Sequence, residues 1–188
     1  MSEAAPHVLL GYQQRWISDK SPVKIAEKSR RIGLTWAEAA DDVLIAGTSK
    51  ASGGDDVYYI GYNQDMAREF IDTCAGWARE FAQACEAVEE TLVEDEDSDI
   101  LAFRIRFASG YKITALSSRP SNLRGKQGVV VIDEAAFHPD LNELLKAAFA
   151  LLIWGGRVRI ISTHNGVDNP FNELIEDNRA GRNRYSLH

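Results

Sequence analysis

The sequence predicts an α/β fold, a mostly parallel β-sheet sandwiched by helices with an added β-hairpin. Three observations predict it. Short β-branched or aromatic runs alternate along the chain with longer segments of helical periodicity. The run GVVVIDE at 128–134 is apolar up to its last two residues, which is typical of a central parallel strand buried on both faces. Polar residues also gather directly after three of the predicted strands, where parallel α/β sheets bind their ligands.

The elements follow in order along the chain. A strand at 23–28 leads through a turn into a helix whose apolar residues recur at helical spacing: Trp36, Ala39, Ala40, Val43 and Leu44. A second strand at 56–62 precedes a long helix with one apolar stripe: Met66, Phe70, Cys74, Trp77, Phe81, Cys85 and Val88. Strands ILAFRIRF and YKITAL flank Ser109 and Gly110 and predict the hairpin. After the strand at 128–134, we expect a helix near 140–153, a strand at 157–162 and a helix near 171–180.

Length and composition indicate one domain with a substantial core. The chain has 188 residues, of which 45% are hydrophobic, and its net charge of −7 argues against a basic nucleic-acid-binding surface over the whole domain. The longest apolar run, 147–154, is shorter than the roughly 20 residues of a membrane span, and no signal sequence is seen. We therefore expect a cytoplasmic protein that does not associate with a membrane. Cys74 and Cys85 lie ~16 Å apart on one predicted helix, too far for a disulfide. The acidic tract EDEDSD at 94–99 predicts a solvated loop rather than a metal site.

The segment AEKSRRIGLTW at 26–36 resembles a phosphate-binding loop that lacks its usual lysine. In the pattern GxxxxGK[ST], Gly33 and Thr35 are in register, whereas Leu34 replaces the lysine and Lys28 replaces the first glycine. A helix beginning near Leu34 would point its N-terminal amides at a phosphate, and Thr35 would supply a hydroxyl to Mg²⁺. The loop consists of Lys28, Ser29, Arg30, Arg31, Ile32, Gly33, Leu34 and Thr35, and its missing positive charge must come from Lys28, Arg30 or Arg31.

Asp133 and Glu134 at the end of VVVIDE form the second motif. One carboxylate can hold Mg²⁺ through water, and the next can orient a water for attack on a γ-phosphate. An Asp-Glu pair after a strand can also simply cap the next helix. The phosphate loop earlier in the chain favours the catalytic interpretation.

Three further segments are candidates on weaker grounds. Thr163 and His164 in STHN follow the next strand and can sense whether a γ-phosphate is present, although a histidine there can also be purely structural. Gln13 in GYQQRW can present a donor and an acceptor to an adenine edge, or can lie in an exposed polar turn. Arg124 in SNLRGKQG can act as an arginine finger, bind DNA phosphate or do neither.

Together, YQQRW, EKSRRIGLTWAEA, LRGKQGVVVIDEA and ISTHNG resemble the ATPase domain of viral large terminase subunits, most closely the Mu-like prophage group. The resemblance runs from about residue 9 to 175, with the motifs in the family's order. It implies a P-loop NTPase fold of the ASCE/RecA-like kind that uses ATP and Mg²⁺. In lambda-like terminases a lysine at the start of the loop replaces the later one, as Lys28 would here, whereas other terminases have an arginine matching Arg30.

The resemblance also implies roles for single residues. Gln13 matches the adenine-contacting glutamine, Asp133 the Mg²⁺-associated carboxylate, with Thr35 as the second metal contact, and Glu134 the catalytic glutamate. Ser162, Thr163 and His164 match the motif that couples hydrolysis to DNA movement. Arg124 lies near the place of an arginine that acts on a neighbouring subunit. That correspondence is the loosest of the set.

The implied function is packaging of double-stranded viral DNA into a procapsid in the cytoplasm of a bacterial host. The implied partners are the DNA, a small terminase subunit, the portal of the procapsid, and further copies of this chain in a ring. Full-length terminases also carry a C-terminal nuclease. Because only 24 residues follow His164, we expect residues 1–188 to hold the ATPase domain alone. Two alternatives remain: a helicase-like DNA-remodelling ATPase, and a nucleotide-binding interaction module that does not hydrolyse ATP.

Overall fold

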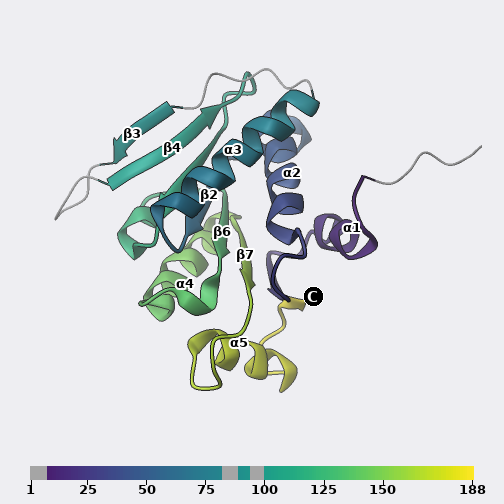
Figure 1. Cartoon of the computed structure of the whole chain (residues 1–188), viewed down its shortest axis with the longest axis vertical. Coiled ribbons are helices and arrows are strands. Elements are labelled where there is room, and N and C mark those ends of the chain that lie inside the picture. The colour runs from purple at the N-terminus through teal and green to yellow at the C-terminus, as the bar shows by residue number, and fades with distance from the viewer. Residues whose placement is uncertain (1–7, 82–88, 94–99) are drawn as a thin grey trace, which may run out of the picture.

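The computed structural model describes residues 8–81, 89–93 and 100–188. Figure 1 shows a central sheet with helices on both sides. The strands are β1 Val23–Glu27, β2 Val57–Gly61, β3 Glu89–Val93, β4 Ile100–Arg106, β5 Lys112–Ser117, β6 Val129–Asp133, β7 Arg157–Ser162 and β8 Ser186–Leu187. The α-helices are α1 Gly11–Ser18, α2 Leu34–Gly47, α3 Gln64–Glu80, α4 Leu141–Ala150 and α5 Pro170–Arg179. Short 3₁₀ turns are η1 Lys50–Ser52, η2 Pro120–Leu123, η3 Ala135–Phe137 and η4 Leu151–Trp154.

The eight strands lie in the order β3-β4-β5-β2-β6-β7-β1-β8. Strands β5, β2, β6, β7, β1 and β8 pair in parallel, and β4 runs antiparallel between β3 and β5. The predicted mostly parallel sheet with a hairpin is therefore confirmed. Because β7 lies between β1 and β6, the polar residues after all three strands reach the same edge of the sheet.

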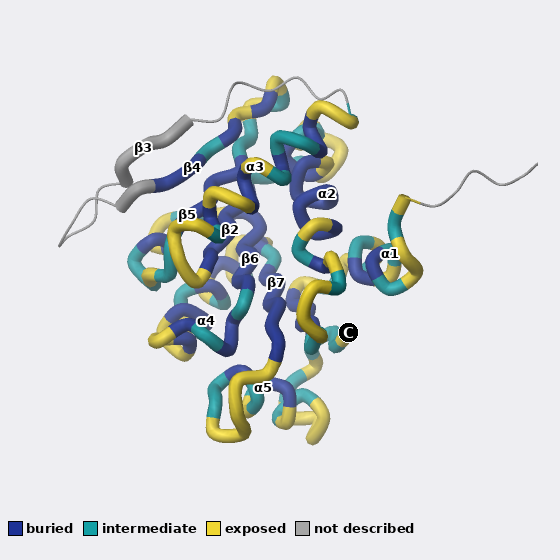
Figure 2. Tube along the Cα trace, in the orientation of Figure 1, coloured by how far each residue is buried: buried dark blue, intermediate teal, exposed yellow. Residues whose placement is uncertain are grey.

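The sheet has an apolar layer on each face. Tyr59 and Val131 belong to one core cluster with α2 and α3, whereas the next residues along the strands, Ile60 and Ile132, pack with α4 and α5. Strand β6 is buried at every position, as its continuous apolar run predicts. Figure 2 shows the buried strands in the interior and exposed residues on the outer turns. This packing fixes the strand ends that carry the candidate site.

Two predicted apolar faces need correction. On α2, Trp36 and Leu44 are 42% and 41% exposed, while the acidic residues Glu38, Asp41 and Asp42 are buried. They face inward because Arg159 of β7 binds all three carboxylates. On α3, Phe70, Cys74 and Trp77 are buried as predicted, but Met66 is only half-buried.

Several segment predictions also change. Helix α3 ends at Glu80, and Cys85 and Val88 of the predicted stripe, like the acidic tract at 94–99, lie outside the described residues. The segment around Gln13 is helix α1, with Gln13 and Trp16 buried, so an exposed turn is wrong. The helix expected to reach 153 ends at Ala150 and continues as η4. Strands β3 and β8 were not predicted. Within the described residues, no helix combines the length and apolar character that a membrane span requires.

Candidate functional site

The loop between β1 and α2 is held in a tight left-handed turn. Gly33 has φ 73° and directly precedes the first residue of α2, and Arg31 also has a positive φ of 56°. The side-chain amide of Gln13 donates to the carbonyl of Gly33 at 2.8 Å, and the Tyr12 hydroxyl donates to the carbonyl of Ile32. Helix α1 therefore braces the loop from outside, which is a role that the sequence pattern did not indicate.

Replacing Gly33 with alanine is expected to lower the free energy of unfolding by ~1–2 kcal/mol, because an L side chain is strained at this φ. The added Cβ would also lie 3.1 Å from the Gln13 amide nitrogen. Gly53 is a matched control, since its φ is 90° but an added Cβ would meet nothing within 4 Å. Urea unfolding of both variants checks the prediction. An equal loss in both would show that the contact with Gln13 contributes nothing.

Lys28 and Glu134 form an ion pair across the strand ends. The Lys28 Nζ lies 2.8 Å from Glu134 Oε1, and the two side chains are 8% and 27% exposed. They come from the ends of β1 and β6, which are separated by β7. Glu134 adopts a left-handed conformation with φ 50° and ψ 44°, which is unfavourable for a residue with a Cβ. Packing and hydrogen bonds around this turn keep its carboxylate turned toward the loop.

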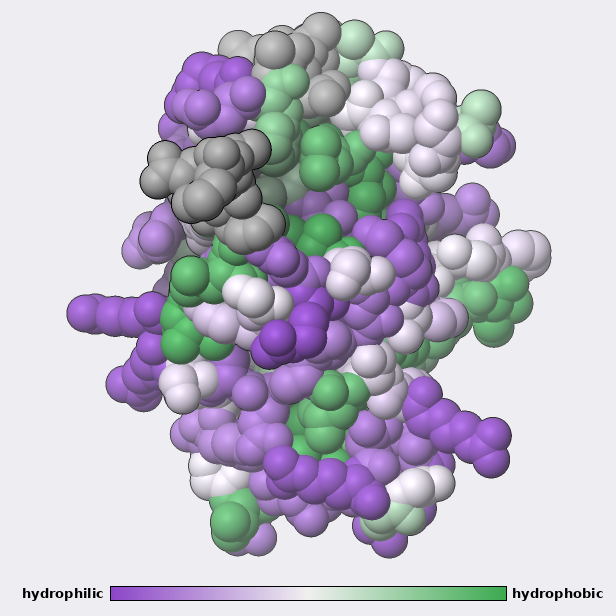
Figure 3. Space-filling model, turned by 90° about the vertical axis from the view of Figure 1, so that its right-hand side faces the viewer, coloured by the Kyte–Doolittle hydropathy of each residue, from purple (hydrophilic) through white to green (hydrophobic). Residues whose placement is uncertain are grey.

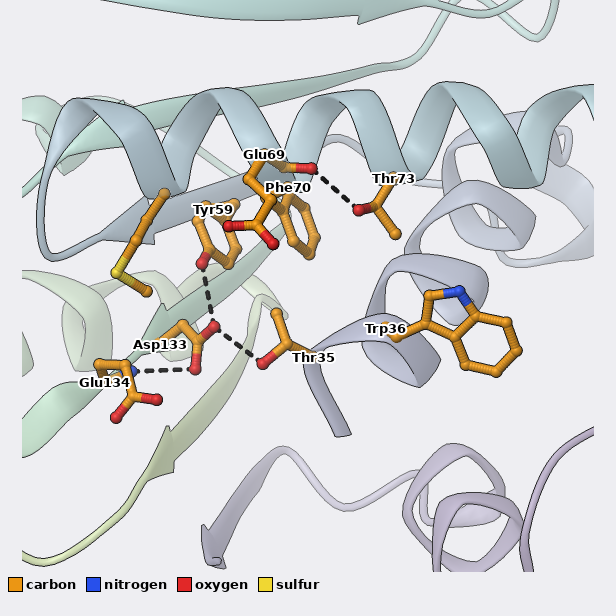
Figure 4. A pocket seen from close by; sticks show the side chains of 9 residues that line it. Thr35, Trp36, Tyr59, Glu69, Phe70, Thr73, Asp133 and Glu134 are labelled. Atoms are coloured by element: carbon orange, nitrogen blue, oxygen red, sulfur yellow. Dashed lines mark hydrogen bonds between the residues drawn. The ribbon is translucent and has the colours of Figure 1, made fainter. Parts of the chain in front are cut away.

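Asp133 lies at the centre of a hydrogen-bond network. Its Oδ2 accepts from the Thr35 hydroxyl and the Tyr59 hydroxyl, both at 2.9 Å, and its Oδ1 accepts from the Glu134 backbone N–H. Figure 4 shows these contacts meeting between β6, α2 and β2. Burial raises the pKa of Asp133 above its ordinary value, and the nearby Lys28 ammonium opposes that rise. The network positions a carboxylate and a hydroxyl side by side.

These oxygens fit a magnesium ion. Thr35 and Asp133 line a cavity of about 260 Å³ together with Glu134 and residues of α3. Mg²⁺ prefers oxygen ligands and usually takes only one or two from protein, the rest from phosphate and water. Among the residues that the structure describes, no group of three or more His, Cys, Asp or Glu side chains forms a metal cluster. A site of this type does not need one.

The end of β7 and the two residues after it lie beside the same loop, but their side chains point in different directions. Ser162 Oγ accepts from the Ala136 backbone N–H at 3.0 Å, and Thr163 lines a second cavity with Arg30, Arg31 and Glu134. His164 turns away and contacts Glu27 Oε1 at 2.6 Å. Of the two residues predicted to sense phosphate, the structure therefore brings Thr163 to the cavity and directs His164 to the neighbouring carboxylate.

The remaining predicted residues divide into two groups. Arg30 and Arg31 are exposed and line the cavity of about 420 Å³ that also contains Thr163 and Glu134. Arg124 lies elsewhere, in a cavity lined by the loop before β6, the C-terminal half of α4, and Trp154. The structure thus does not bring Arg124 to Glu134 within one chain.

Two residues of the site were missed by sequence reasoning. Tyr59 was assigned to a strand, and nothing in its sequence context showed that its hydroxyl reaches Asp133. His138 is buried, with Nε2 2.8 Å from the Asp133 carbonyl and Nδ1 2.5 Å from Ser118 Oγ. Burial lowers its pKa, so the neutral ring donates from Nε2 and accepts at Nδ1. Its position four residues after Glu134 was the only available signal.

The sheet order, the loop after β1 and the Asp133-Glu134 pair at the end of β6 define a P-loop NTPase fold. Residues 25–187 match the family described as terminase large subunit, T4-like virus type, N-terminal. The chain therefore belongs to the terminase large subunit family.

Relatives of known origin agree with this assignment. The chain is 66% identical over 181 residues to the Mu-like prophage FluMu protein gp28 of Haemophilus influenzae and 58% identical over 195 residues to the probable terminase large subunit gp28 of Escherichia phage Mu. These matches cover 96% and 100% of this chain but only 36% and 35% of the relatives. The chain thus spans about a third of their length.

Solved structures share the fold. The large terminase of a thermophilic bacteriophage has a TM-score of 0.64 at 14% identity, over 95% of this chain and 44% of that chain. The HK97 bacteriophage large terminase has a TM-score of 0.62 at 13% identity, over 98% and 39%. The large terminase ATPase domain of Thermus phage P74-26 has a TM-score of 0.55 at 20% identity, over 87% and 67%.

Proposed function

We propose that this chain is the ATPase domain of a DNA-packaging motor, which hydrolyses ATP with Mg²⁺ to move double-stranded viral DNA into a procapsid. The observation that carries the proposal is the Lys28–Glu134 ion pair beside the Thr35–Asp133 contact. A cation, a hydroxyl and two carboxylates at one sheet edge are the groups that phosphoryl transfer needs. Membership of the terminase family favours this function over a helicase-like remodeller.

Lys28 holds the γ-phosphate in this proposal. Its flexible stem lets the ammonium leave Glu134 for a phosphate that lies against the first amides of α2, where the helix dipole favours negative charge. Arg30 and Arg31 add positive charge from the second cavity, which they line together with Glu134. Bound at Thr35 and Asp133, Mg²⁺ supplies neutralisation of the charge on the phosphate oxygens.

Glu134 acts as the general base. Once Lys28 has moved to the phosphate, the Glu134 carboxylate orients a water and accepts one of its protons. The water oxygen bonds to the γ-phosphorus while the bond from that phosphorus to the bridging oxygen breaks, and ADP leaves with the electron pair. Inorganic phosphate is the second product. The ion pair keeps Glu134 from acting until a nucleotide displaces Lys28.

Gln13 contacts the adenine edge. Its amide nitrogen donates to Gly33 O and its amide oxygen accepts from Leu10 N, both at 2.8 Å. A glutamine amide has two N–H donors and two acceptor lone pairs, so one donor and one acceptor remain. Adenine offers the complementary pair. Gln13 thus connects base recognition to the loop that holds the phosphates.

Coupling and assembly complete the proposal. Ser162 and Thr163 relay the state of the site, and His164 acts through Glu27. Arg124 serves a neighbouring subunit of the ring, because it lies apart from Glu134 in its own chain.

Residues 1–188 form the ATPase domain, and nuclease activity is not expected of them. The partners are DNA, a small terminase subunit and the portal, in the cytoplasm of the bacterial host. Figure 3 shows that hydrophilic side chains cover much of one face.

Replacing Lys28 with alanine tests the Lys28–Glu134 ion pair on which the proposal rests. We expect the preference for ATP over ADP to fall by roughly tenfold or more, since a charged hydrogen bond contributes ~1.5–3 kcal/mol. Arg30→Ala is the matched control, because Arg30 is exposed and leaves the ion pair intact. Titration of both variants with ADP and with a non-hydrolysable ATP analogue measures the preference.

Two results would count against the proposal. If Lys28→Ala keeps the wild-type preference while Arg30→Ala loses it, the γ-phosphate is held by Arg30 instead. If wild type binds ATP but shows no turnover at high protein concentration with DNA present, the non-hydrolysing interaction module is the better account.

A further inference from the structure

Helix α5 contacts both halves of the site through its two ends. At its N-terminus, the Asn169 amide nitrogen donates to the Ala136 carbonyl at 2.8 Å. In its last turn, Arg179 Nη2 lies 2.5 Å from Glu27 Oε2. Ala136 is two residues after Glu134, and Glu27 is directly before Lys28. The helix therefore bridges the segments that carry the ion pair.

The turn after Glu134 is fixed at Ala136. Its N–H is bound by Ser162 Oγ at 3.0 Å, and its carbonyl accepts from Asn169 at 2.8 Å and from Asn165 at 3.2 Å. With both backbone groups of Ala136 bound, Glu134 is held in its left-handed conformation, which a residue with a Cβ does not favour alone. The two asparagines and Ser162 therefore hold the turn that carries the Glu134 carboxylate.

The residue before Lys28 is fixed in a similar way. Glu27 Oε1 contacts His164 Nε2 at 2.6 Å, and Glu27 Oε2 contacts Arg179 at 2.5 Å. The Lys28 backbone N–H donates to the Ser162 carbonyl at 3.0 Å. The Arg179 side chain is 49% exposed, so its ion pair contributes little to overall stability. A contact of this kind can still direct the start of the loop.

We propose that Asn169 and Arg179 are positioning residues that set the separation of Lys28 and Glu134 through α5. This inference rests on the proposed function. When a nucleotide draws Lys28 away from Glu134, the two segments that α5 contacts move relative to each other, and the helix responds. Helix α5 is then the element through which nucleotide binding reaches the surface of the domain.

Asn169→Asp tests the N-terminal contact without removing the helix cap. Asn169 Oδ1 accepts from the Phe171 N–H at 2.9 Å, and aspartate keeps that acceptor while losing the donor to Ala136. We expect kcat to fall roughly 10- to 100-fold, because a small displacement of the base is sufficient for such a loss, with KM for ATP within about twofold of wild type. Thermal unfolding should be nearly unchanged. Asn165→Ala/Asn169→Asp removes both donors and should lower kcat further.

Arg179→Gln tests the other end of the helix. We expect a several-fold rise in KM for ATP, since the start of the loop loses its anchor, and partial recovery in Arg179→Lys. Arg182→Gln is the control, because Arg182 pairs with Asp177 in the same region and not with Glu27. As a measurement independent of turnover, hydrogen exchange of α5 should change on adding Mg²⁺ and a non-hydrolysable ATP analogue in wild type, and change less in Asn169→Asp.

The outcomes separate this inference from the proposed function. Two results would overturn the positioning role alone. In the first, the wild-type protein turns over ATP and Asn165→Ala/Asn169→Asp does so with the same kcat. In the second, the hydrogen exchange of α5 does not change when the nucleotide binds. A wild-type chain that binds no nucleotide would overturn both. A fall in kcat that is matched by an equal loss of thermal stability would show a merely structural role and also overturn the inference.

Discussion

Glu134→Gln is expected to bind ATP as wild type does and to turn it over at least ~100-fold more slowly, since a positioned general base contributes 10²–10⁴-fold. Glutamine keeps an oxygen that can accept from Lys28, so the contact at 2.8 Å and the left-handed turn are retained. What it loses is the ability to take a proton from water. The effect should therefore fall on kcat and not on affinity.

The measurement is single-turnover hydrolysis together with nucleotide titration. Glu69→Gln is the control, because Glu69 lines the same cavity but comes from α3 rather than from the end of a central strand (Figure 4). It should keep most of the wild-type rate. Retention of more than a tenth of wild-type kcat in Glu134→Gln would exclude Glu134 as the base and direct attention to another carboxylate of the cavity.

The sheet and the position of the site could be predicted from local patterns in the sequence. The apolar run of β6 is typical of a strand buried on both faces, and in such a strand Asp133 lies at the carboxyl end. Since parallel strands share one edge for these ends, Lys28, Asp133 and Thr163 were expected together, and all three lie at that edge. Hydrophobic periodicity, and the rule that parallel strands end at one edge of the sheet, were enough to predict where the site lies.

Pairing across the fold could not be obtained in the same way. The acidic face of α2 reads as solvent-exposed until Arg159, 117 or more residues later, is known to lie beneath it. Trp36 and Leu44 were accordingly assigned to the core and are exposed. The direction of His164 toward Glu27, and the distance of Arg124 from Glu134, depend on loop paths that no local pattern encodes.

Arg159→Met is expected to give the largest loss of stability, ~3–5 kcal/mol, because it leaves buried carboxylates without their counter-ion. Arg159 is 2% exposed, and its guanidinium contacts Glu38 at 2.5 Å and Asp41 and Asp42 at 2.8 Å each. Lys20 Nζ lies 3.6 Å from Asp41 Oδ1 on the exposed side. Lys24 is a buried cation nearby, and burial lowers its pKa to about 8. It donates to the Trp16 carbonyl and cannot replace the guanidinium fork.

Urea unfolding measures this loss, and Asp42→Asn is the informative control. Burial, reinforced by the nearby Glu38 carboxylate, raises the pKa of Asp42 well above 3.8. Its Oδ2 is buried with no hydrogen-bond partner among the described residues. The folded state therefore binds this proton more tightly than the unfolded state does, and Asp42 becomes less favourable for stability as pH rises above about 4. Asparagine can keep an oxygen for Arg159 and carries no charge.

The two variants should consequently change the free energy of unfolding in different ways at neutral pH. Asp42→Asn should be as stable as wild type or more so, and its advantage should grow as pH rises from about 4 toward the folded-state pKa of Asp42. Arg159→Met should be strongly destabilised over the same range, with some recovery at low pH as the carboxylates take up protons. If Arg159→Met loses less than ~1 kcal/mol, or if Asp42→Asn is destabilised as strongly, the arginine does not hold the acidic face of α2 against the sheet.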